Sequence, residues 1–139
     1  MTYGSGSESA GYLGKVRELG FKVLFNADYL ENDPLGRAEW IKVFGALYCR
    51  EEMADSIFRS IEESYNITKE YISKSIVKRP TVLSGLPFRD SWFISPGNSF
   101  ISQLIDDAGG SYLWRETKSE ISMPLSMEAV FVKSLDADY

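Results

Sequence analysis

The most continuous hydrophobic pattern in the chain covers residues 34–48, PLGRAEWIKVFGALY. Apolar residues recur every three or four positions from Leu35 to Tyr48, which predicts a helix with one apolar face. Further apolar side chains, among them Trp40 and Val43, lie off that face and leave few positions for water. A helix that is apolar nearly all round is buried on several sides. We therefore expect this helix to be a strut between two α/β units.

The segment before the strut predicts a short βαβ unit. Residues 1–4 are typical of the end of a strand and lead into the loop GSGSES. Residues 11–19 follow a helical pattern that Gly20 ends, and FKVLF at residues 21–25 is typical of a buried strand. Strand, helix and strand in so short a stretch indicate parallel pairing.

After the strut, the pattern predicts one long helix and then a second α/β unit. The long helix covers residues 50–75, with apolar and charged side chains on opposite faces. The elements expected after it are strands at 81–86, 92–94 and 112–114, a polar loop at 115–123, and helices at 100–108 and 126–132. The chain opens and closes inside what we expect to be strands, whose backbone groups need partners. We therefore expect it to be a portion of a longer protein.

Composition narrows the function classes. The apolar fraction is 44% and the aromatic fraction 14%, enough for a packed core. The net charge of −5, without a basic run, argues against a nucleic-acid partner. Histidine is absent, which removes Ser-His-Asp and Cys-His catalysis and His-ligated zinc. Cys49 is the single cysteine, so no intrachain disulfide forms, and no apolar run approaches the ~20 residues of a membrane span.

Loops that follow the expected strands are the candidate binding elements. In open α/β sheets, ligands bind beyond the carboxyl ends of the strands. The loops at these ends are residues 4–9, 26–33, 87–91 with 95–99, and 114–123, and all are rich in Gly, Ser, Asn or aromatic residues. Taken singly, each loop has the residues that ordinary turns contain. Together they predict the wall of a cleft.

Two of these loops have an anion-binding interpretation beside the plain turn. Residues 4–7 read GSGS but lack the GxxxxGK[ST] pattern of a phosphate loop. Their main-chain N–H groups suit an anionic ligand group, and a flexible strand-to-helix turn is the alternative. Residues 95–99, SPGNS, leave the same two interpretations open.

Three side chains elsewhere also have two interpretations. Trp92 and Trp114 lie at expected strand ends, where an indole either stacks on a flat ligand or packs in the core. Glu128 lies in the first turn of the last helix. Its carboxylate is either a simple partner of the helix dipole or an exposed docking charge. Adjacent acidic pairs on the helices, such as Asp106 and Asp107, are not catalytic pairs because neighbouring helical residues do not face each other.

Three segments together resemble a known family. They are PLGRAEWIKVFGALY at 34–48, RPTVLSGLPFRDSWFISPGNSFISQLIDDAGG at 79–110, and PLSMEAVF at 124–131. In this order they are similar to substrate-binding proteins of ABC importers, in the subgroup that handles ferric siderophores, haem and cobalamin. Such proteins are longer than 139 residues, and the chain resembles their central to C-terminal portion.

The resemblance implies an α/β fold of two lobes, built from Rossmann-like βα units and joined by a long interlobe helix, as in class III substrate-binding proteins. A shallow ligand cleft would lie between the lobes, which would move little on binding. Residues 1–33 would be the end of the N-terminal lobe, residues 34–49 the interlobe helix, and residues 50–139 the C-terminal lobe without its last elements.

The resemblance also implies a function without catalysis. The protein would capture a metal chelate in the periplasm or at the outer face of the cell membrane, as a lipoprotein in some cases, and deliver it to the permease of an ABC importer. The chelate would bring its own metal, so no cofactor, metal-ligating residue or catalytic residue is expected. The alternative is a Rossmann-like enzyme domain that binds a nucleotide or cofactor, but neither a phosphate fingerprint nor a general base is visible.

Site residues are expected by position within this resemblance. The ligand-binding candidates are Tyr3, Ser5, Ser7, Tyr29, Arg89, Trp92, Asn98, Ser99 and Trp114. Glu128 matches the glutamate with which the C-terminal lobe of family members pairs with permease arginines. Around Trp40 and Phe44 we expect apolar surface that is exposed or covered by a second copy, which predicts a possible homodimer.

Overall fold

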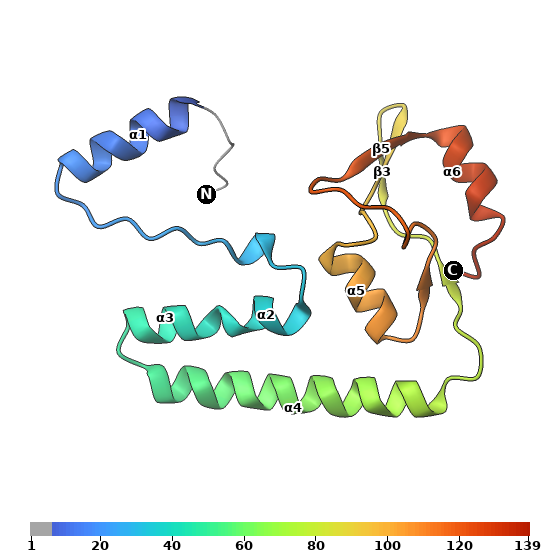
Figure 1. Cartoon of the computed structure of the whole chain (residues 1–139), viewed down its shortest axis with the longest axis horizontal. Coiled ribbons are helices and arrows are strands. Elements are labelled where there is room, and N and C mark those ends of the chain that lie inside the picture. Colours follow the sequence, from blue (N-terminus) through green and yellow to red (C-terminus); the bar gives the residue numbers. More distant parts are fainter. Residues whose placement is uncertain (1–6) are drawn as a thin grey trace.

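The computed structural model describes residues 7–139, with side chains from Tyr12 onward (Figure 1). Its helical elements are α1 (Ser7–Glu18), the 3-10 turn η1 (Asp28–Leu30), α2 (Pro34–Glu39), α3 (Ile41–Leu47), α4 (Glu51–Ser75), α5 (Phe100–Asp107) and α6 (Met127–Ser134). Its strands are β1 (Thr81–Val82), β2 (Leu86–Phe88), β3 (Ser91–Ile94), β4 (Ser111–Tyr112) and β5 (Met123–Ser126). Helices and strands alternate in the second half of the chain, so the expected α/β class is confirmed.

The expected strut helix is present as two helices in line, α2 and α3. Asp33 caps α2, because its Oδ1 accepts the main-chain N–H groups of Leu35 at 2.7 Å and Gly36 at 3.0 Å. At Trp40 the main-chain N–H reaches the carbonyl of Arg37 at 3.4 Å, which is a tighter i to i−3 contact. This single tight turn separates the two helices, so the prediction of one uninterrupted helix was wrong in that detail.

The long helix α4 packs antiparallel against α3 (Figure 1). Gly45 makes the close approach possible, because a Cβ atom there would overlap the Cβ atom of Ala54. Lys42 lies over the ring of Phe58 at 4.2 Å and pairs with Asp55 at 3.6 Å. The expected helix over residues 50–75 is therefore confirmed, and its buried residues Ala54 and Phe58 face α3 and its connection.

The expected strand at residues 21–25 is wrong. The main chain from Phe21 to Ala27 belongs to no helix or strand, and Phe21, Leu24 and Phe25 are exposed. A strand needs a neighbour for its N–H and C=O groups, and no described residue supplies one. The other expected strand of this unit, at residues 1–4, lies outside the described residues. The predicted βαβ unit is thus absent from the described part, although its helix is present as α1.

The second α/β unit, expected after α4, contains two small sheets. β1 pairs in parallel with β4, with Thr81 opposite Ser111. β2, β3 and β5 form an antiparallel sheet in the order β2-β3-β5. Gly85, at φ 147°, separates β1 from β2 within the expected strand, and a Cβ atom there would overlap the Trp92 indole. β5 begins at the last residue of the expected loop 115–123 and ends at the first residue of the expected helix 126–132.

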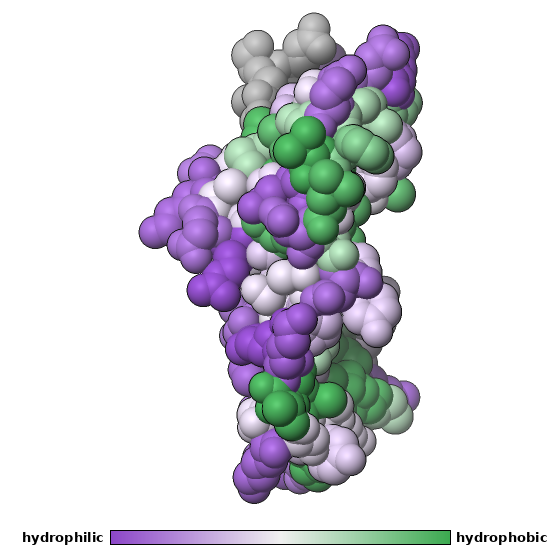
Figure 2. Space-filling view, turned by 90° about the vertical axis from the view of Figure 1, so that its right-hand side faces the viewer, coloured by the Kyte–Doolittle hydropathy of each residue, from purple (hydrophilic) through white to green (hydrophobic). Residues whose placement is uncertain are grey.

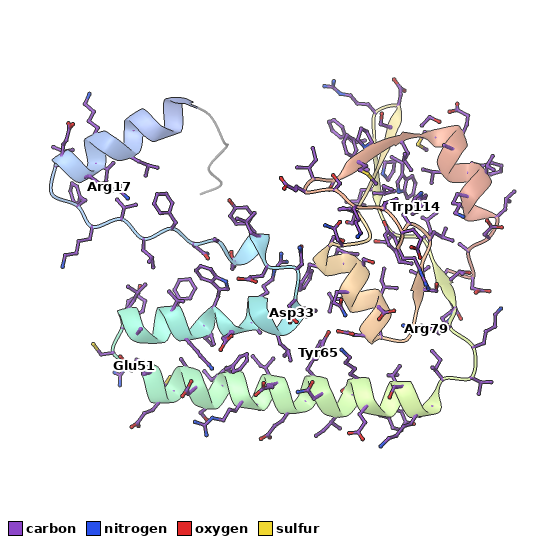
Figure 3. The ribbon with its side chains drawn as sticks, viewed as in Figure 1. Arg17, Asp33, Glu51, Tyr65, Arg79 and Trp114 are labelled. Carbon is purple, nitrogen blue, oxygen red and sulfur yellow. The ribbon has the colours of Figure 1, made fainter. Side chains whose placement is uncertain are left out.

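Polar contacts join α4 to the C-terminal half. Asp107 on α5 accepts hydrogen bonds from the Tyr65 hydroxyl at 2.6 Å and from Lys69 Nζ at 2.8 Å. Arg79, after α4, donates to the Asp106 carboxylate at 2.6 Å and to the Gly110 carbonyl at 3.1 Å. Figure 3 shows Tyr65 rising from α4 toward α5, and Arg79 beside the turn after α5. These contacts set the position of α5, whose first turn borders the candidate site.

The hydrophobic core is small and lies mainly in the C-terminal half. Ile94 on β3 is fully buried, and Tyr112 and Val130 are nearly so. No helix among residues 7–139 is long and apolar enough to cross a membrane. The division of the chain into lobes at residues 33 and 49 stays a prediction.

Candidate ligand-binding cleft

A cleft of about 500 Å³ lies where three loops meet. The lining comes from Tyr29, Leu30, Asn32 and Arg37, from residues 95–96 and 98–101, and from residues 119–122. The three loops are parts of the segments expected at 26–33, 95–99 and 114–123. The volume is in the range of small-molecule sites in proteins.

Arg37 holds the first loop in place. Its Nε donates to the carbonyl of Asp28 at 3.2 Å, and its Nη2 donates to the carbonyls of Tyr29 at 3.1 Å and Glu31 at 3.4 Å. The guanidinium also stacks on the ring of Phe100, 3.9 Å from its centroid. A single side chain of α2 thus fixes the η1 loop and connects it to the first residue of α5.

The second loop, residues 95–99, is held by main-chain contacts. The Tyr112 hydroxyl donates to the Ser95 carbonyl at 2.8 Å, and burial raises the pKa of Tyr112 to about 12. The Gly97 N–H donates to the carbonyl of Thr117 at 2.9 Å. A Cβ atom at Gly97 would overlap the main chain of Arg115, so the close approach of these two loops requires glycine.

The third loop is tied to the second. Asn98 Oδ1 accepts the main-chain N–H of Ser119 at 3.1 Å, and the Ser119 hydroxyl donates to the Ile121 carbonyl at 2.8 Å. Thr117 stabilises the turn before it, with its hydroxyl 2.7 Å from the carbonyl of Trp114. These hydrogen bonds fix residues 119–122 in place as one wall of the cleft.

The lining suits a ligand that presents oxygen atoms and some apolar surface. Serine hydroxyls and asparagine amides dominate its polar groups, and Leu30, Ile101 and Ile121 add apolar area. Ser99 caps the N-terminus of α5, and its hydroxyl oxygen accepts the main-chain N–H of Ser102 at 3.3 Å. The first main-chain N–H groups of a helix have no partner inside the helix, so those of Phe100 and Ile101 remain available as donors.

Three of the expected ligand-binding residues line this cleft, namely Tyr29, Asn98 and Ser99. Tyr3 and Ser5 lie outside the described residues. Ser7 is the first residue of α1, and its side chain lies outside the described part of the structure.

The other three expected residues lie elsewhere. Arg89 is in the turn between β2 and β3, at φ 56°, with its guanidinium 5.3 Å from the ring of Phe88. Trp92 lies within the antiparallel sheet, and its indole Nε1 is buried without a hydrogen-bond partner in the described structure. Trp114 packs edge-on to Tyr112, with 5.8 Å between the ring centroids (Figure 3). The structure does not bring these three side chains to the cleft.

Sequence reasoning missed Arg37, Phe100 and Glu120 as residues of the site. Arg37 is one of the few charged residues in the otherwise apolar strut, and this was the feature of the sequence that could have indicated a role in the site. Phe100 was assigned to a helix face, and Glu120 to a polar loop. Their contribution depends on loops that are distant in the sequence and meet only in the fold.

Glu128 lies in the first turn of α6 and is exposed. Its own main-chain N–H and then the Ser126 hydroxyl hydrogen-bond to the carboxylate and lower its pKa, so it is charged at neutral pH. α6 lies on the outer side of the β3–β5 pair, away from η1 and α5 (Figure 1). Both earlier interpretations of Glu128, helix-dipole partner and docking charge, agree with this position.

The chain is similar to two uncharacterized proteins of Methanocaldococcus jannaschii, and no family model matches it. It is 30% identical over 127 residues to the uncharacterized lipoprotein MJ0878, which covers 91% of this chain and 30% of that protein. It is 29% identical over 92 residues to the uncharacterized protein MJ0642, covering 66% of this chain and 28% of that protein. The chain therefore spans about a third or less of the length of these relatives.

Solved structures with a similar fold are solute-binding proteins. A possible iron-binding, periplasmic solute-binding protein of Staphylococcus epidermidis matches with a TM-score of 0.68 at 15% identity, over 91% of this chain and 48% of its own. An ABC transporter substrate-binding protein of Listeria monocytogenes matches with a TM-score of 0.64 at 20% identity, over 91% of this chain and 46% of its own. A periplasmic solute-binding protein of Veillonella parvula matches with a TM-score of 0.65 at 20% identity, over 92% of this chain and 37% of its own.

These likenesses show the fold. The chain has the α/β architecture of part of a solute-binding protein, and its structural neighbours are binding proteins rather than enzymes.

Proposed function

We propose that this chain belongs to an extracytoplasmic solute-binding protein that captures a metal chelate and delivers it to an ABC importer. The chelate would be a ferric siderophore, haem or a corrinoid. The observation that carries the proposal is the cleft between the η1 loop and the two loops of the C-terminal half, on a fold shared with solute-binding proteins.

The chelate class rests on three observations. The sequence motifs resemble the siderophore, haem and cobalamin subgroup, and one structural neighbour is described as possibly iron-binding. The cleft offers hydroxyl and amide groups and main-chain N–H donors. Among residues 7–139, no three His, Cys, Asp or Glu residues gather as metal ligands. A lining of this kind suits the outer oxygen atoms of a ligand that already holds its metal.

The place and the partner follow from the same proposal. One relative is named a lipoprotein and two structural neighbours are described as periplasmic, which supports a location outside the cytoplasmic membrane. Glu128 would contact arginines of the permease, because it is charged and exposed, and its helix α6 lies on the opposite side of the β3–β5 pair from α5.

Ligand titration tests the proposal. The purified protein is titrated with a ferric hydroxamate, a ferric catecholate, haemin and cyanocobalamin, and heat release and native mass spectrometry report binding. We expect one of these classes to bind with a one-to-one ratio. Failure of all four, or binding of a nucleotide instead, would contradict the proposed function.

A variant of Tyr29 tests whether the ligand binds in the cleft. Its exposed ring lines the cleft, so Tyr29→Ala removes aromatic contact with the ligand. A loss of aromatic stacking is worth about 0.5–1.5 kcal/mol, which is roughly a threefold to tenfold weaker affinity. Tyr71→Ala on α4 is the control, since Tyr71 is similarly exposed and does not line the cleft. Equal affinities of the two variants would place the ligand elsewhere.

A further inference from the structure

We infer that the cleft selects chelates by charge, and that Glu120 makes it favour neutral or cationic complexes over anionic ones. The inference rests on the proposed function and names the ligand class of the same site. It follows from which charges line the cleft and which of them are already engaged by the protein.

Among the residues that the structure describes, the lining contains two charged side chains, Arg37 and Glu120. The guanidinium of Arg37 donates to three main-chain carbonyls and covers the face of Phe100. These contacts occupy Nε and Nη2 and fix the plane of the guanidinium, so these two donor atoms face the η1 loop, while the guanidinium keeps its positive charge. A ligand that needed this cation would have to compete with the structure of the η1 loop itself.

Glu120, unlike Arg37, makes no ion pair or hydrogen bond that is seen among the described residues. It is exposed on the third loop, and no cation among residues 7–139 lies within ion-pair distance of its carboxylate. The neighbouring Arg115 pairs instead with Glu116 at 3.0 Å, and Lys118 does not line the cleft. Glu120 is therefore a lining residue whose carboxylate has no ion-pair partner among the described residues.

Two further carboxylates lie in the first loop but do not line the cleft. Asp28 and Glu31 flank Tyr29 and Leu30, and Glu31 borders a separate groove, where its carboxylate accepts the Trp40 indole N–H at 3.2 Å. Like charges repel more strongly near a protein surface than in bulk water. A highly anionic chelate would meet the unpaired Glu120 carboxylate and a guanidinium whose Nε and Nη2 donors are already used by the protein.

The uncharged part of the lining determines what can bind well. Its serine hydroxyls and asparagine amides donate to neutral oxygen acceptors, and the first N–H groups of α5 do the same. Ferric hydroxamates present such oxygens with a net charge that is zero or positive. Ferric catecholates carry several negative charges, so the same cleft disfavours them.

A pair of ferric complexes of opposite charge tests the inference on the purified protein. The probes are ferrioxamine B, a cationic trihydroxamate, and ferric enterobactin, a triply anionic tricatecholate. At low salt we expect ferrioxamine B to bind at least about tenfold more tightly. The ratio should shrink at high salt, because exposed charges are screened.

Variants at position 120 locate the effect. Glu120→Gln should lower the ratio of the affinity for ferrioxamine B to the affinity for ferric enterobactin by about threefold to tenfold. Glu120→Lys should lower this ratio further or reverse the preference. Glu63→Gln, the same change on the exposed surface of α4, should leave the ratio unchanged. All three variants should unfold at the temperature of the parent protein, because both glutamates are exposed.

The outcomes separate this inference from the function on which it rests. Tighter binding of ferric enterobactin by the parent, or an unchanged ratio in both Glu120 variants, would overturn the charge selection while the chelate function stands. Binding of haemin or cyanocobalamin alone would also overturn the charge selection and leave the chelate function standing. Absence of binding by every chelate would overturn the function and the inference together.

Discussion

Arg37 shows how much of the cleft depends on one side chain. Its fork of donors reaches three carbonyls of the η1 loop, while its flat face covers Phe100. A lysine keeps the charge but has neither the planar fork nor the stacking face. The position therefore requires arginine for its geometry rather than for its charge.

We predict that Arg37→Lys loosens the η1 loop and weakens ligand binding. The lost hydrogen bonds should cost about 1–2 kcal/mol of unfolding free energy. Amide hydrogen exchange of residues 28–31 should become faster, and chelate affinity should fall about tenfold. Arg59→Lys, at an exposed position of α4, should change neither quantity. Unchanged exchange in Arg37→Lys would contradict the role assigned to this side chain.

Gly97 is a second position with a steric requirement. Any side chain there would overlap the Arg115 main chain, so Gly97→Ala forces the second and third loops apart. We predict a loss of about 1–3 kcal/mol in urea unfolding, as for other overpacked sites. Gly14→Ala in α1 is the control, because a Cβ atom there meets no atom within 4 Å. It should be neutral or stabilise the helix by about 0.5–1 kcal/mol.

Asp107 makes the stability of the α4–α5 contact depend on pH. Burial acts to raise the pKa of its carboxyl, but hydrogen bonds from Lys69, Tyr65 and Gln103 outweigh burial, and the net pKa is below the ordinary value. The carboxylate thus stabilises the fold at pH values above the unfolded carboxyl pKa of about 4. This contribution is lost as the pH falls through the lower pKa of the folded state.

We predict that Asp107→Asn destabilises the protein at pH 7 and that the difference from the parent shrinks as the pH falls below about 4. Urea unfolding at a series of pH values measures this difference. Asp90→Asn, in the exposed turn between β2 and β3, should show a small difference at every pH. A constant effect of Asp107→Asn across the series would show that its charge is not the stabilising feature.

Among the elements, α6 is the one that we assign to the transporter. Glu128 is charged, lies at the helix N-terminus and points into solvent rather than into the fold. We predict that Glu128→Arg leaves chelate affinity unchanged and abolishes uptake by cells, because repulsion replaces attraction to permease arginines. Glu63→Arg on α4 should leave uptake intact. Normal uptake with Glu128→Arg would rule out the docking role.

The elements also differ in how far local pattern specifies them. The start of α2 and the bounds of α4, α5 and α6 are predicted nearly as observed, because periodicity and capping residues such as Asp33 and Ser99 act within one or two turns. The segment at residues 21–25 has an equally clear strand pattern, yet it pairs with nothing among the described residues. Hydrogen bonding to a neighbouring strand is not a local property.

For the molecule as a whole, the exposed surface is unusually large. The accessible surface is 10,578 Å², whereas a compact monomer of 15.7 kDa exposes about 7,300 Å². Part of the difference is apolar, as at Phe44, Tyr48 and Met53, which border a groove between α3 and α4. Figure 2 shows further hydrophobic surface on the face that carries α6 and the β2–β3 hairpin. Trp40, by contrast, is half-buried.

We predict that this chain by itself associates through its apolar surface, as a dimer or a larger species. The excess surface, about 3,300 Å² per chain, exceeds the roughly 1,000–2,500 Å² that each partner of an obligate dimer buries. Light scattering after size exclusion, over a range of concentrations, measures the mass. Phe44→Glu should shift the population toward monomer, and Ser60→Glu on α4 should not. A monomer at every concentration, with Phe44 protected from solvent, would contradict this prediction.

Helices, their caps and the polar character of the loops are readable from residues 7–139 because these properties arise within a few residues of one another. The position of the cleft was also partly predictable, since three of the expected loops and Tyr29, Asn98 and Ser99 line it. The tertiary structure alone decided the break at Trp40, the antiparallel sheet, the role of Arg37 and the exclusion of Trp92 and Trp114 from the cleft. Each of these depends on contacts between distant segments, whose free energies no local pattern contains.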